Sequence, residues 1–195
     1  MHPTTALTWL IALPLVASPV IYLVGRLSFR GSHNDRSPVA AWLAVAAMLA
    51  SGFPLYFAGK AVLSGAPVEL AVNTVHLRMD GIGLLLAVVV LLLGTMVMLF
   101  STAYMAGDQG EEKFYALLSA MVGSIIGLGC AADLFNLWVW FEAMAITSYM
   151  LVAFYTTQPA SLEAGFKYLV QSAAGSVFVL LGIVLVFSQI GRAHV

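Results

Sequence analysis

Glu142 is the residue of this sequence that is best placed to do chemistry. It lies eight residues into an apolar stretch, Leu134 to Tyr155, and its neighbours include Trp138, Trp140 and Phe141. If the stretch is a membrane-spanning helix, Glu142 lies roughly 12 Å into a hydrocarbon core about 30 Å thick. A charged side chain near the centre of a bilayer costs on the order of 2.5 to 3.5 kcal/mol on insertion scales. A carboxyl at such a position predicts a role in moving protons or cations.

A purely structural interpretation of Glu142 stays open beside the functional one. A protonated carboxyl could make a hydrogen bond between two helices and serve packing alone. The depth of Glu142 favours proton handling, because burial disfavours the charged form of a carboxyl and lets the group hold a proton at neutral pH.

Lys167 and Gln171 are the other polar residues that could take part. Lys167 lies near the start of the apolar stretch Ala164–Ser188, and Glu163 precedes it by four residues. An ion pair at the membrane interface is an ordinary explanation, whereas a partly desolvated lysine can accept or release a proton. Gln171 lies one turn deeper, where it could hydrogen-bond a water chain or hold two helices together. We assign Glu142 and Lys167 to proton transfer, with Gln171 and Glu163 in support.

The composition indicates which elements must position these residues. Of 195 residues, 62% are hydrophobic and 9% are charged, against roughly 25% charged in soluble domains. We therefore expect an all-α membrane protein, since the backbone in lipid must bond to itself and the apolar stretches lack strand-like alternation. About six helices are expected, at 6–24, 39–57, 82–104, 114–131, 134–155 and 164–188.

The loops predict one further element and an orientation. Val68–Val72 and Val75–Met79 are short β-prone segments around Asn73-Thr74, so we expect a small hairpin on the outer membrane face between the second and third helices. Arg26 and Arg30 follow the first apolar stretch, which fits an N-terminus outside.

The fourth helix and the loop before it have simple structural interpretations. Small residues recur at four-residue spacing, a pattern that lets helix backbones approach closely in lipid; they are Ser119, Gly123, Gly127 and Ala131. The charges of the preceding loop are expected to form a solvated cluster; they are Asp108, Glu111, Glu112 and Lys113.

Several function classes are excluded by missing motifs. The sequence has no Gly-rich phosphate loop, no CxxC, no HExxH and no Rossmann fingerprint, and Cys130 is its single cysteine. The helices also lack two histidines suited to haem ligation. We expect no cofactor and no metal in this chain, and a net charge of −1 gives no reason to expect a nucleic-acid partner.

Three segments together resemble one family. Residues 133–142 read DLFNLWVWFE, residues 165–173 read GFKYLVQSA, and residues 80–84 read DGIGL. They resemble the proton-conducting antiporter-like subunits of respiratory complex I, its L, M and N types, and of Mrp cation/proton antiporters. In that family the matching glutamate is essential for proton transfer and the matching lysine belongs to a central polar axis. The resemblance implies these roles for Glu142 and Lys167.

The same resemblance implies partners and a location. Quinone chemistry and NADH oxidation would take place in other subunits of a membrane arm, and the chain would lie in the cell (inner) membrane. Family members continue past a sixth helix to a further lysine that pairs with the glutamate. Our hypothesis is that 1–190 is the N-terminal part of a proton-conducting transporter domain, that the chain is a fragment, and that its last few residues, within a tail at 191–195, are not native.

The predicted function is therefore a proton-translocating subunit of a complex I-type NADH:quinone oxidoreductase, with no redox chemistry in this chain. A Mrp-type subunit that exchanges sodium ions for protons is the first alternative, because Phe-Asn-Leu before Glu142 resembles the Mrp D-type pattern at least as well. A membrane scaffold subunit without transport is the second. An unrelated carrier is disfavoured by the scarcity of polar residues in the six stretches.

Overall fold

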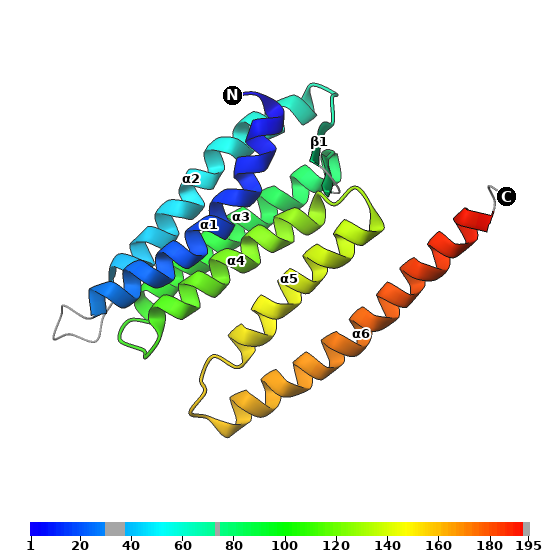
Figure 1. The fold of residues 1–195 in the computed structure, drawn as a ribbon. Helices are drawn as coiled ribbons and strands as arrows, with labels where there is room; N and C mark the ends of the chain where they lie inside the picture. Colours follow the sequence, from blue (N-terminus) through cyan, green and yellow to red (C-terminus); the bar gives the residue numbers. More distant parts are fainter. Residues whose placement is uncertain (30–37, 73–74, 193–195) are drawn as a thin grey trace.

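The computed structural model describes residues 1–29, 38–72 and 75–192. These residues form six α-helices and one β-hairpin, as Figure 1 shows, which confirms the all-α membrane class. The elements in chain order are α1 (Pro3–Phe29), α2 (Pro38–Leu63), β1 (Val68–Val72), β2 (Val75–Met79), α3 (Gly81–Tyr104), α4 (Glu111–Gly129), α5 (Leu134–Val152) and α6 (Pro159–Arg192).

Within the described ranges, five helices are long and apolar enough to cross a membrane, by length and composition. The sequence predicts six, and the difference lies in α4. This helix has 19 residues, and its first turn carries Glu111, Glu112 and Lys113. It packs against α1, α2, α3 and α5. Because other helices enclose it, α4 does not need the apolar surface of a helix that faces lipid.

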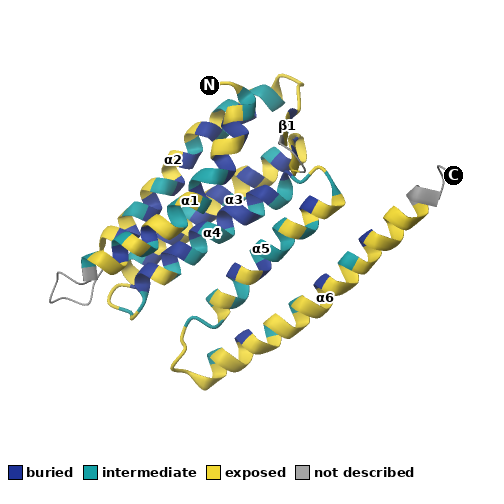
Figure 2. Ribbon diagram, in the orientation of Figure 1, coloured by how far each residue is buried: buried dark blue, intermediate teal, exposed yellow. Residues whose placement is uncertain are grey.

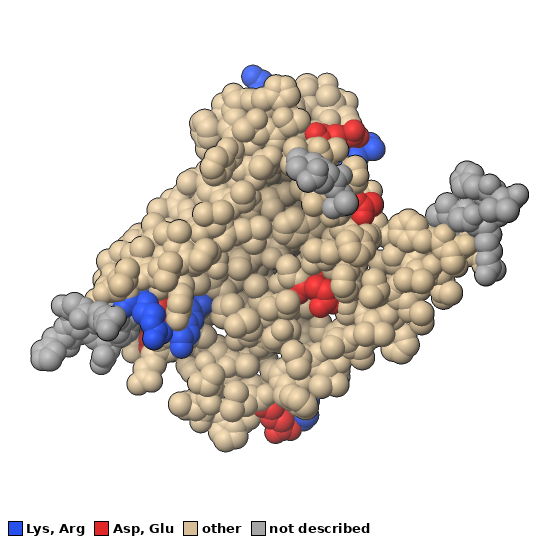
Figure 3. All heavy atoms as spheres, viewed as in Figure 1, with Lys and Arg blue, Asp and Glu red and all other residues tan. Residues whose placement is uncertain are grey.

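The first four helices form a packed bundle, α5 lies along α4, and α6 lies along α5 at the edge of the molecule (Figure 1). Figure 2 shows that buried residues concentrate in the bundle, while α6 is exposed along most of its length. Figure 3 shows Lys and Arg side chains towards the ends of the helices, with a nearly uncharged surface between them. This distribution is typical of helices that cross a hydrocarbon layer.

The small residues of α4 form the predicted packing face. A Cβ on Gly123 would lie 2.8 Å from Cγ of Leu15, and one on Gly127 would lie 2.5 Å from ring atoms of Trp140. The buried Ser119 hydroxyl donates a hydrogen bond to the Pro14 carbonyl on α1 over 2.8 Å. These contacts leave no room for larger side chains, so the stripe holds α1, α4 and α5 together.

The β-hairpin lies at the same end of the bundle as the N-terminus (Figure 1). Its strands pair antiparallel with Val68 opposite Met79, which confirms the two predicted strand ranges; Asn73-Thr74 lie outside the described residues. The α4–α5 connection joins the hairpin, because Arg78 N–H donates to the Cys130 carbonyl and Ala132 N–H donates to the His76 carbonyl. The residue Ala131, predicted to continue the α4 stripe, instead forms a bridge with Leu77.

Candidate functional site

Helix α5 begins at a well-defined cap, and this cap sets the position of Glu142. The Asp133 carboxylate accepts a hydrogen bond from the Asn136 backbone N–H over 2.8 Å and a second one from the Asn136 side-chain amide. Such an N-cap satisfies donors that a helix start otherwise leaves open. From this start, Glu142 lies two helical turns along α5, roughly 12 Å from the capped end.

The Glu142 side chain is half-buried, and one of its oxygens is enclosed by protein. That oxygen, Oε1, has no hydrogen-bond partner among the described residues. Leaving a buried polar atom unpaired costs on the order of 1–3 kcal/mol, so such atoms are few in native proteins and each needs an explanation. Glu142 is therefore a costly carboxyl with a free acceptor position inside a predicted membrane span.

Trp140, two residues before Glu142 in α5, has its ring held against α4. It lies against Gly127, where only the absence of a Cβ makes space for the indole. One turn before Glu142, Trp138 Nε1 donates a hydrogen bond of 2.7 Å to the buried Ser176 hydroxyl on α6. The backbone on the N-terminal side of Glu142 is thus fixed to α4 and to α6.

Lys167 and Glu163 are brought together, as their spacing predicts, but not with Glu142. Lys167 Nζ donates to Glu163 Oε1 over 2.6 Å, and the two side chains are 68% and 66% exposed. Gln171 is also exposed. Among the residues that the structure places, no hydrogen bond or ion pair joins Glu142 to Lys167 or Gln171. These polar groups of α6 lie on a face that the described chain leaves open.

The start of α6 differs from the prediction. The sequence predicts a helix from 164, whereas α6 begins at Pro159. Lys167 is therefore eight residues, or roughly 12 Å, into the helix rather than one turn. The reason is that proline favours the first position of a helix, where its missing N–H is not needed.

The charge cluster before α4 contains two residues that the sequence interpretation places wrongly. Glu111 and Glu112 are buried, at 2% and 6% exposed, whereas Lys113 is exposed. Within the described chain, Glu112 Oε2 and the Tyr115 hydroxyl have no hydrogen-bond partner. The cause is tertiary, because α4 enters the centre of the bundle and its first turn is covered. A negative charge there is favoured by the helix dipole.

A signal for this burial was present in the sequence. Continuing the four-residue stripe of α4 backwards from Ser119 reaches Tyr115 and then Glu111. Residues four apart lie on one face of a helix, so the buried packing face extends to the first turn.

Comparisons with known proteins assign the chain to a family. Residues 131–195 match the transmembrane family described as NADH:quinone oxidoreductase/Mrp antiporter, and residues 69–115 match the N-terminus of complex I chain 5. NAD(P)H-quinone oxidoreductase chain 5 of Synechocystis sp. is 30% identical over an alignment of 188 residues, which covers 91% of this chain and 28% of the relative. NADH-quinone oxidoreductase subunit N of Desulfitobacterium hafniense is 31% identical over 174 residues, which are 89% of this chain and 34% of the relative. The chain belongs to the antiporter-like membrane subunits of the complex I and Mrp family.

A solved structure agrees with the fold of this antiporter-like subunit. A chain in the structure of the membrane-bound sulfane sulfur reductase, an archaeal respiratory membrane complex, superposes with a TM-score of 0.78 at 23% identity. The superposition covers 96% of this chain and 38% of that one. At this identity the likeness concerns the fold alone. The chain spans about a third of the length of the two curated relatives above, and it is a multi-pass integral membrane protein.

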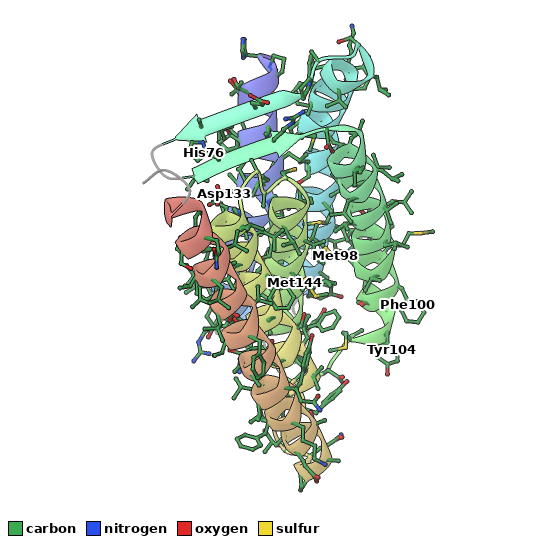
Figure 4. The ribbon with its side chains drawn as sticks, turned by 90° about the vertical axis from the view of Figure 1, so that its right-hand side faces the viewer. His76, Met98, Phe100, Tyr104, Asp133 and Met144 are labelled. Atoms are coloured by element: carbon green, nitrogen blue, oxygen red, sulfur yellow. The ribbon has the colours of Figure 1, made fainter. Side chains whose placement is uncertain are left out.

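The cap of α5 makes one prediction for this antiporter-like subunit. The pKa of Asp133 is held below its ordinary value, mainly by the hydrogen bond from the Asn136 backbone N–H, with a smaller contribution from His76. Figure 4 shows His76 and Asp133 at the same end of the molecule, by the hairpin. We expect Asp133→Ala to lower the free energy of unfolding by about 1 kcal/mol at pH 7, the usual value of a cap. Thermal unfolding in detergent measures this difference.

The pH dependence of that difference has a definite sign. A carboxyl whose pKa is lower in the folded state stabilises the fold above its unfolded pKa of about 3.9, and this contribution is lost as the pH falls through the folded pKa. The difference between Asp133→Ala and the unchanged protein should therefore shrink in acid. Asp133→Asn, which keeps a side-chain acceptor, is the matched control and should lose less at pH 7. An equal difference at pH 7 and pH 3 would contradict the assignment.

Proposed function

We propose that this antiporter-like subunit translocates protons in an NADH:quinone oxidoreductase-type complex of the inner cell membrane, with Glu142 as the carboxyl that binds and releases the proton. The observation that carries the proposal is the enclosed Oε1 of Glu142, which has no hydrogen-bond partner in the described part of the chain and lies within a helix long and apolar enough to span the membrane. A structural carboxyl would be expected to use that oxygen in a hydrogen bond. A proton carrier needs it free to receive a proton.

The proposed mechanism is electrostatic. When Glu142 loses its proton, a negative charge appears in a region of low dielectric, where attraction to a cation is several-fold stronger than in water. Lys167 is the basic residue of α6 that lies closest to Glu142 in the sequence. In the structure its ammonium group donates a hydrogen bond to the Glu163 carboxylate. An exchange of Lys167 between Glu163 and the charged Glu142 would couple the two sites. Gln171, one turn along α6, would support a hydrogen-bonded chain between them.

The partners follow from the family. The relatives are named as chains and subunits of quinone oxidoreductases. We propose that other membrane-arm subunits surround this chain and that the nicotinamide and quinone reactions occur in partner subunits. This chain would then need no cofactor of its own, and its transported species would be the proton.

A Mrp-type subunit that exchanges sodium ions for protons is the second candidate, because the family that matches residues 131–195 includes Mrp antiporters. Measurements on inverted membrane vesicles that contain the full-length subunit in its complex distinguish the oxidoreductase proposal from the antiporter proposal. Acidification of the vesicle interior driven by NADH, and abolished by deleting the subunit, supports the oxidoreductase proposal. A pH gradient that added sodium ions dissipate without any electron donor supports the antiporter instead.

Lys167 makes a separate prediction. If it takes part in proton transfer, Lys167→Gln should lower the translocation rate about tenfold, which corresponds to about 1.4 kcal/mol in the barrier. Glu163→Gln removes only the partner and should lower the rate less. If the pair is an ordinary exposed ion pair, both variants should have the same small effect, of about 0.5 kcal/mol on stability and none on the rate. Proton uptake by the same vesicles measures the difference.

A further inference from the structure

A groove runs along the surface where α2 meets α3, and no proposed step of proton transfer uses it. The part of the groove towards the C-terminal end of α2 is a hollow of about 500 Å³. A second hollow of about 370 Å³ continues it, and Gly52, Leu55 and Val88 line both. We call this surface the α2–α3 groove; it is defined by Gly52, Leu55, Tyr56, Lys60, Leu84 and Val88.

Glycines on α2 create the groove. A Cβ on Gly52 would have no atom within 4 Å, so the surface at this position is open space. A Cβ on Gly59 would lie 3.2 Å from Leu84 of α3, so this glycine lets the two helices approach at one end. The groove is thus a hollow along two helices that approach each other closely at Gly59 and Leu84.

The polarity of the groove changes along its length. The residues of α2 that line its two hollows run from Met48 to Leu63, a distance of about 22 Å along the helix, which is roughly three quarters of the thickness of a bilayer's hydrocarbon core. The lining is apolar for most of this distance. Lys60 and the exposed Tyr56 lie towards one end, in the last two turns of α2. In the part of the chain that the structure describes, Lys60 has no carboxylate within ion-pair distance.

We propose that the α2–α3 groove binds one anionic phospholipid, with an acyl chain along the apolar hollow and the phosphate at Lys60. Tyr56 lies one helical turn before Lys60 on α2, and tyrosine rings are enriched where lipid headgroups meet the hydrocarbon layer. An acyl chain gains no hydrophobic free energy by leaving the bilayer for a protein groove, because both are apolar. Preference for this lipid must therefore come from the shape of the groove and from the charge of Lys60.

The charge sets the expected preference. One lysine near an anionic membrane surface favours an anionic headgroup by about fivefold. The complex with the full-length subunit, purified in detergent, can be titrated with phosphatidylglycerol or phosphatidylcholine, and the bound lipids counted by native mass spectrometry. We expect about fivefold stronger retention of phosphatidylglycerol. Inorganic phosphate at the same concentration should not compete, since it has no acyl chain.

Three variants test where the lipid binds. Lys60→Gln should abolish the preference for the anionic lipid while some lipid is still retained. Gly52→Leu, which extends a side chain into open space, should remove one bound lipid of either kind. Lys113→Gln makes the same charge change on an exposed lysine at the other end of the bundle and should keep the preference. A preference that survives Lys60→Gln, an unchanged lipid count in Gly52→Leu, or a photo-crosslinker at Tyr56 that captures a neighbouring polypeptide would each overturn the proposal.

Discussion

Glu142→Gln is expected to stop proton translocation while the complex still assembles. Glutamine has nearly the size of a protonated glutamic acid and can keep the neutral hydrogen-bonding pattern, but it cannot bind or release a proton. A transfer step that depends on a positioned acid or base should slow by 10²-fold or more, on the order found for other such groups. Acidification of inverted vesicles, driven by the complex with its full-length subunit, measures the rate.

The matched control for this prediction is Glu69→Gln. Glu69 lies on the hairpin, is exposed, and pairs with Arg78 at 3.6 Å. The same chemical change there removes one surface charge and should leave the translocation rate unchanged. Unchanged translocation in Glu142→Gln, with assembly intact, would instead identify the chain as a membrane scaffold and refute the proposed role of its carboxyl.

The bounds of elements that depend on local chemistry could be predicted from the sequence. The strands Val68–Val72 and Val75–Met79 are found at their predicted bounds, because β-prone runs around a short turn allow one register. Helix α3 begins one residue from its predicted start, since Asp80 caps it by accepting hydrogen bonds from the Ile82 and Gly83 N–H groups. Apolar composition alone also indicated the membrane class.

The candidate site could be predicted only in part. Glu142 stands out because a carboxyl is rare in an apolar stretch, and that signal needs no tertiary information. The burial of Glu111 and Glu112 depends on α4 entering the centre of the bundle, which composition does not reveal. The relation of Lys167 to Glu142 depends on how α6 packs, and the ion pair with Glu163 shows that a neighbour four residues away holds the lysine first. Whether the lysine exchanges partners stays a prediction.

Gly127→Ala is expected to destabilise the subunit and to disturb the site without touching a charge. The added methyl group would lie 2.5 Å from two ring atoms of Trp140, well inside van der Waals contact. Either the indole or the α4–α5 spacing must shift, and such overpacking costs about 1–3 kcal/mol. Because Trp140 lies two residues before Glu142, the shift should also displace the carboxyl. Thermal unfolding in detergent measures the first effect, and the translocation rate of the complex measures the second.

The appropriate comparison is Gly182→Ala on α6. It makes the same substitution in a helix, but its Cβ would have no atom within 4 Å among the described residues. Alanine is favoured over glycine in a helix by about 1 kcal/mol, so this variant should be as stable as the unchanged protein or more stable. The two substitutions therefore have opposite expected signs. If Gly127→Ala were as stable as Gly182→Ala, the Trp140 ring would not be held against α4. The inference that this contact fixes the position of Glu142 on α5 would then be contradicted.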